Sequence, residues 1–68
     1  MKILEREDNT GLRRISEAEA LKLLEKGETV ILQTNSRDYS KVENKLDISN
    51  TKRLFDMGIH KKFMLYAE

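Results

Sequence analysis

The chain has 68 residues, of which 38% are apolar and 37% charged, and it contains no cysteine and one histidine. A chain this short forms one domain, residues 1–68, and buries only about 60% of the surface that its unfolded form exposes. Disulfides and zinc sites built on cysteine are excluded, so the apolar residues, or a partner, must stabilise the fold. The 13 basic and 12 acidic residues give a net charge of +1, which lacks the strongly basic character of many nucleic-acid-binding proteins.

Residues 1–8 become charged after two apolar residues and therefore lack the apolar segment of a signal peptide. No apolar run approaches the roughly 20 residues that a membrane-spanning helix needs. We therefore expect a cytoplasmic protein without a membrane segment.

Two short strands are predicted near the N-terminus. Residues 2–6 form the first, with Ile3 and Leu4 on opposite faces, and residues 12–15 form the second. The residues between them, 7–11, include Asn and Gly, which are typical of tight turns. This arrangement predicts that the two strands pair as a hairpin.

A helix over residues 16–26 is the strongest prediction from the sequence. Ser16 and Glu19 match a capping box, and apolar residues follow at helical spacing until Gly27, a typical helix stop. Residues 29–34 then carry β-branched and apolar side chains on both faces, which indicates a central strand.

Residues 39–48 fit two structures. Val42, Leu46 and Ile48 alternate with charged residues as in a half-buried strand, whereas Tyr39, Val42 and Leu46 have the spacing of one helical face. We favour the strand and keep the helix as the alternative.

A second helix is predicted from a cap at Ser49 or Asn50 through Met57, with a stop at Gly58. A helical projection gathers four residues on its apolar side: Thr51, Leu54, Phe55 and Met57.

The pattern of residues 61–67 predicts a last strand, with Phe63, Leu65 and Ala67 on one face and Met64 and Tyr66 on the other. The complete order, β-(β)-α-β-(β)-α-β, predicts an α+β fold with a small mixed or antiparallel sheet. We expect three or four strands with one or two helices packed on it.

The residues offer little for catalysis. His60 is the one histidine and lies in a basic stretch beside a helix stop, where it has no nucleophile to activate. No carboxylate lies in an apolar segment that would raise its pKa, and the three isolated glycines form no phosphate-binding loop. We predict a protein that is not an enzyme and that uses no metal or cofactor.

Binding to a protein partner is the favoured function. Tyr39 and Tyr66 combine an apolar ring with a polar tip, as contact residues often do. Lys61 and Lys62 begin the predicted last strand, which could pair with a partner strand if it lay at a sheet edge. We expect a regulator or inhibitor of another protein, with a homodimer as a further option.

The alternative function is DNA binding. The sequence Leu46-Asp47-Ile48-Ser49, followed by Thr51-Lys52-Arg53-Leu54, resembles the turn and recognition helix of helix-turn-helix proteins, although Asp47 replaces the usual glycine. The resemblance implies a first helix over residues 39–46 and a reading helix over 49–58. Five residues would then contact nucleic acid: Asn50, Lys52, Arg53, Lys61 and Lys62.

Residues 15–33, with a capped helix, Gly27 and a strand in succession, also resemble the opening of several small phage-encoded protein families. Some of these families act by occupying host proteins. This resemblance favours a phage or mobile-element origin and assigns no functional residues.

Overall fold

The computed structural model describes residues 2–6 and 8–68 as a five-stranded antiparallel sheet and two helices. The strand order across the sheet is β1-β4-β3-β5-β2. The elements along the chain are β1 (Lys2–Leu4), β2 (Arg13–Ile15), α1 (Glu17–Glu25), β3 (Val30–Asn35), β4 (Asp38–Val42), α2 (Lys45–Asp56) and β5 (Met64–Ala67). The α+β class is confirmed, with one or two strands more than the sequence predicted.

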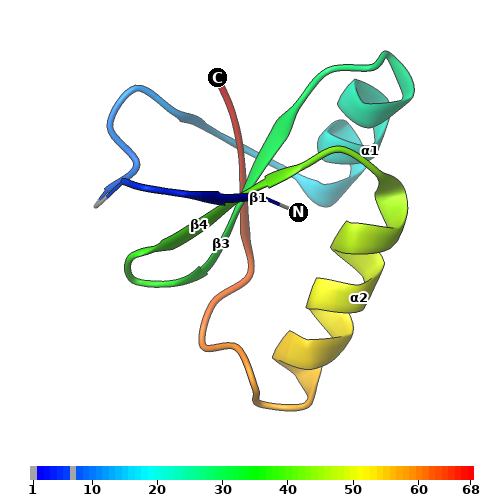
Figure 1. Ribbon diagram of the computed structural model, residues 1–68. Coiled ribbons are helices and arrows are strands. Elements are labelled where there is room, and N and C mark those ends of the chain that lie inside the picture. The colour runs from blue at the N-terminus through cyan, green and yellow to red at the C-terminus, as the bar shows by residue number, and fades with distance from the viewer. Residues whose placement is uncertain (1, 7) are drawn as a thin grey trace.

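Both helices pack on one face of the sheet, at the right of Figure 1, and the blue connection from β1 to β2 lies on the other side. The main core lies between the helices and the sheet and contains Ile15, Ala20, Val30, Leu32, Val42, Ile48, Leu65 and Ala67. A smaller cluster on the opposite face joins Ile31, Tyr39 and Tyr66. The central strand β3 contributes to both clusters, as its two apolar faces predicted.

The first two strands do not form the predicted hairpin. β1 pairs with β4 and β2 pairs with β5, so the two strands lie at opposite edges of the sheet. The connection between them therefore has to cross a sheet face, and the helices already occupy the other face. Turn-forming residues at 8–11 fit a tight hairpin and a longer crossing equally well, because both need a chain reversal.

The first helix begins as predicted. The Ser16 hydroxyl accepts a hydrogen bond from the Glu19 backbone N–H at 3.2 Å. The Glu19 carboxylate does not return to the cap but accepts from Arg13 Nη1 at 3.3 Å, so one half of the capping box is formed. Gly27, with φ of 80°, ends the helix in the left-handed conformation that favours glycine.

Residues 39–48 divide between the two alternatives. Strand β4 ends at Val42, and α2 begins at Lys45, so neither a strand nor a helix spans the whole segment. The Asn44 side chain accepts from the Asp47 N–H at 3.1 Å and caps α2. The predicted cap at Ser49 or Asn50 is wrong, because Asn44 offers the same capping oxygen one turn earlier.

Replacing Asn44 with alanine tests this helix start. The free energy of unfolding should fall by about 1 kcal/mol because the Asp47 N–H loses its acceptor. The same change at Asn50, exposed within α2, should leave stability unchanged or raise it slightly, since alanine favours a helix interior. Urea titration of the two variants measures both effects, and a larger loss at Asn50 would refute the assigned start.

Two ion pairs connect the helices. Lys45, at the start of α2, contacts Glu25 at the end of α1, and Lys52 contacts Glu17 at 3.1 Å. This pairing of opposite helix ends shows that the two helices run antiparallel. The hydrogen bond from Lys45, and then its charge, lower the pKa of Glu25 below its ordinary value. All four side chains are substantially exposed, so we assign these pairs a role in helix alignment more than in stability.

Candidate functional site

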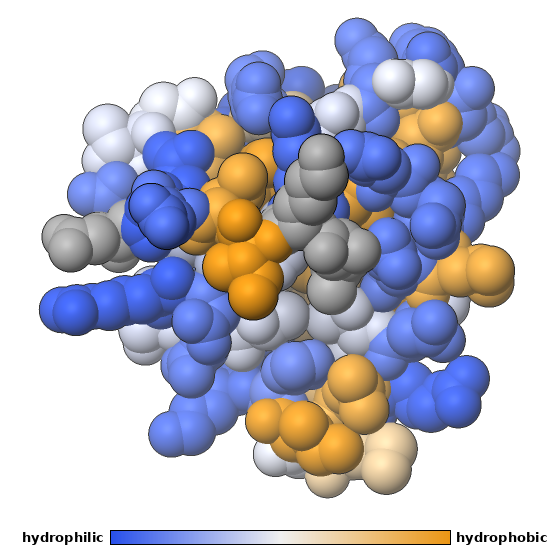
Figure 2. All heavy atoms as spheres, in the orientation of Figure 1, coloured by the Kyte–Doolittle hydropathy of each residue, from blue (hydrophilic) through white to orange (hydrophobic). Residues whose placement is uncertain are grey.

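The C-terminal end of α2 carries a group of exposed apolar side chains, which we call the apolar tip. It consists of Phe55, Met57 and Ile59, which are 38%, 65% and 59% exposed. Figure 2 shows these apolar side chains gathered at the bottom of the molecule, at the end of α2 and surrounded by hydrophilic residues. Adjacent large apolar groups on a surface are typical of an interaction site, whereas single ones are ordinary.

The end of the helix fixes the tip in place. The Gly58 N–H donates to the Phe55 carbonyl at 3.0 Å, and the Ile59 N–H donates to the Leu54 carbonyl at 2.9 Å. These two bonds form a Schellman motif, which Gly58 permits with its φ of 83°. The Phe55 ring also packs against Phe63, with ring centres 6.2 Å apart. The exposed apolar groups therefore belong to an ordered helix end.

The surroundings of the tip are basic. Arg53 and Lys61 are exposed, and neither forms an ion pair with a described residue. Asp56 is the one acidic residue in the segment 53–61, so two cations and one acid give a net charge of +1 with His60 neutral. The tip thus combines apolar contact groups with a positive rim.

Sequence reasoning placed Phe55 and Met57 on the buried side of this helix, which is wrong for Met57 and only partly right for Phe55. The buried residues of α2 are Ile48 and Thr51, one turn or more before the tip. The useful signal was the presence of three large apolar residues within five positions around a glycine stop, more than a helix end can bury.

The predicted contact residues separate into two groups. Tyr39 and Tyr66 are buried, at 2% and 3% exposure, with their ring centres 6.3 Å apart on the sheet face away from the helices. Burial, and then the neighbouring Tyr66, raise the pKa of Tyr39. The two tyrosines and Lys62 line one hollow, whereas Lys61 is exposed near the apolar tip.

Three of the five residues predicted to contact nucleic acid lie together on α2. Asn50, Lys52 and Arg53 are exposed on α2, but Lys52 is engaged with Glu17. The implied first helix over residues 39–46 is wrong, because residues 38–42 form strand β4. A helix-turn-helix needs two successive helices, and β3 and β4 separate α1 from α2.

The last strand is not available for pairing with a partner strand. β5 lies inside the sheet, hydrogen-bonded to β3 on one side and to β2 on the other. The sheet edges are β1 and β2, each three residues long. Short edges, with exposed Arg13 and Arg14 on β2, are features that discourage strand-to-strand association.

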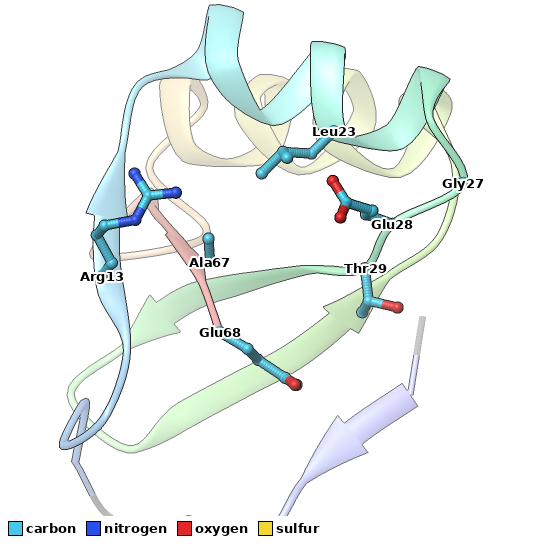
Figure 3. Close-up of a pocket in the computed structure, with 7 residues that line it drawn as sticks. All are labelled: Arg13, Leu23, Gly27, Glu28, Thr29, Ala67 and Glu68. Carbon is cyan, nitrogen blue, oxygen red and sulfur yellow. The ribbon is translucent and has the colours of Figure 1, made fainter.

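A shallow hollow of about 380 Å³ lies between α1 and the end of the sheet (Figure 3). Arg13 and Glu28 stand on opposite sides of it in this view, with Ala67 between them. Arg13 is already held by Glu19, so the hollow has no free cation among its lining residues. Within residues 2–6 and 8–68, no three histidine or carboxylate side chains gather as a metal site would require.

No helix in the described part of the chain is both long and apolar enough to span a membrane. Comparison of the chain with models of protein families, with curated proteins and with solved structures gives no match.

Proposed function

We propose that the chain is a non-enzymatic binding module that acts in the cytoplasm by docking its apolar tip on a partner protein. The observation that carries this proposal is the exposure of Phe55, Met57 and Ile59 at an ordered helix end. Fully covering a large apolar side chain that stands in water contributes roughly 1.5–3 kcal/mol, so each of these partly exposed side chains can contribute a share of that energy to an interface.

The charge around the tip defines the partner further. Arg53 and Lys61 form no ion pair with a described residue, so a partner surface with an apolar pocket and an acidic rim complements them. A second copy of the chain fits less well, because two tips in contact would bring two positively charged rims together. A regulator or inhibitor of another protein, as the sequence predicts, is consistent with this surface.

Site-specific crosslinking tests the proposal. A photo-crosslinking amino acid replaces Ile59 in one variant and Leu46 in a second. Leu46 is 71% exposed near the other end of α2, so it is matched in exposure but lies away from the tip. We expect an adduct with one partner protein from position 59 and none from position 46. Equal adducts from both positions, or none from either, would argue against docking through the tip.

The captured protein then allows a binding measurement. The double change Met57→Asp and Ile59→Asp should weaken its affinity by at least roughly tenfold, because two buried contacts are lost and acidic groups face an acidic rim. Leu46→Asp should leave the affinity unchanged. Capture of a second copy of the chain, with dimerisation in sedimentation experiments, would replace the heterologous partner with a homodimer.

A further inference from the structure

A second hollow, of about 440 Å³, opens on the sheet face away from the helices. This volume lies in the range of small-molecule sites. Its lining comes from the β1–β2 connection, from β2, β3, β4 and β5, from the β3–β4 turn and from the segment between α2 and β5. The residues that line it are Asp8, Asn9, Arg14, Gln33, Ser36, Tyr39, Lys62, Met64 and Tyr66. Segments from both ends of the sequence therefore build one site.

The floor of the hollow is an ordered polar network. The buried Tyr66 hydroxyl donates to Gln33 Oε1 at 2.8 Å and accepts from Asn9 Nδ2 at 3.4 Å. Gln33 Nε2 in turn donates to the Ser36 carbonyl at 3.3 Å. Gln33 is itself only 4% exposed, so a polar side chain has been placed deep in the sheet face and held there. Such networks fix the shape of a site before a ligand arrives.

Two cations, Arg14 and Lys62, and one acid, Asp8, line the hollow. Arg14 and Lys62 form no ion pair with any described residue. Asp8 is the one acidic residue that lines the hollow, and its Oδ1 already accepts from the Thr10 N–H at 3.0 Å. That hydrogen bond lowers the pKa of Asp8, so the carboxylate stays ionised. Two cations and one carboxylate leave one positive charge in excess among the residues that line the hollow.

We infer that this hollow binds a small organic anion through a carboxylate or phosphate group held by Arg14 and Lys62. The guanidinium group of Arg14 supplies a planar pair of donors that matches either oxyanion, and Lys62 supplies a second, point-like charge. The ordered network of Tyr66, Gln33 and Asn9 shapes the remaining wall and offers hydrogen bonds to polar groups of the ligand. This site lies on the opposite sheet face from the helices and does not depend on the apolar tip.

Amide NMR titration of the full chain tests the inference. Inorganic phosphate and citrate are added separately, each against sodium chloride at equal ionic strength. We expect saturable shifts confined to residues that line the hollow, such as Asn9, Arg14, Gln33 and Tyr66. Binding of phosphate alone assigns a phosphate ligand, binding of citrate alone assigns a carboxylate ligand, and both results support the site.

Substitutions of the cations complete the test. Arg14→Gln and Lys62→Gln should each weaken binding roughly tenfold, since each removes a charged hydrogen bond. Lys26→Gln removes an exposed cation at the end of α1 and should leave the affinity unchanged. The amide spectrum of each variant reports whether it is folded. Shifts that do not saturate with either anion, or unchanged affinity in both Arg14→Gln and Lys62→Gln, would overturn the inference.

Discussion

Replacing Ile48 with alanine is expected to lower the free energy of unfolding by roughly 2–5 kcal/mol. Ile48 is fully buried in the main core, where α2 packs against the sheet. Its truncation removes apolar contacts and leaves a cavity that a small core can fill only in part. A domain of this length has little stability to lose, so the variant should be partly unfolded at room temperature.

The matched control is Leu46, two residues earlier on the same helix. Its side chain is 71% exposed, so Leu46→Ala should change the free energy of unfolding by no more than about 0.5 kcal/mol. Thermal and urea unfolding, followed by far-ultraviolet circular dichroism, measure both variants. Equal losses at the two positions would show that α2 does not present this face to the sheet.

This pair also shows why residues 39–48 could not be assigned from the sequence. Leu46 and Ile48 are equally apolar and two positions apart, which suits one face of a strand. In α2 the same two residues lie about 200° apart around the helix, so one is buried and the other is exposed. The deciding feature is the Asn44 cap, whose capping role depends on the strand β4 that precedes it.

Strong local patterns did predict their elements. The cap at Ser16 and the stop at Gly27 define α1 through hydrogen bonds within a few residues. The alternation in the last strand places Leu65 in the main core and Tyr66 in the second cluster, as predicted. Pairing between distant strands was not predictable in the same way, because no short-range signal states that β2 pairs with β5 and β1 with β4.

The candidate sites likewise combine features that local sequence predicts with features that only the fold creates. The apolar tip was missed because a helix drawn from residue 49 assigns Met57 to its packed side, whereas the helix ends before the sheet can cover that residue. Tyr39, Tyr66 and Lys62 were singled out separately for their side-chain chemistry, and the fold brings all three to one hollow. Arg14 joins them there, although its local sequence indicates only a charged strand residue.

The polar network beneath that hollow has a measurable energetic role. Tyr66→Phe should lower the free energy of unfolding by roughly 1–3 kcal/mol, because Gln33 Oε1 loses its 2.8 Å donor in a buried position. Tyr39→Phe is the control. The Tyr39 hydroxyl has no hydrogen-bond partner among the described residues, and no buried side-chain oxygen there lacks one, so this hydroxyl reaches solvent. Its removal should have little effect on stability.

A double-mutant cycle separates the loss of the hydrogen bond from the loss of packing. Gln33→Met keeps the length of the side chain and removes the acceptor. In that background, Tyr66→Phe should cost much less than in the unmodified chain, since no buried oxygen is left without a donor. We expect a coupling energy of roughly 1–2 kcal/mol between the two positions from urea unfolding. An additive result would mean that the hydroxyl and the amide contribute independently, and that the hydrogen bond between them does not couple the two positions.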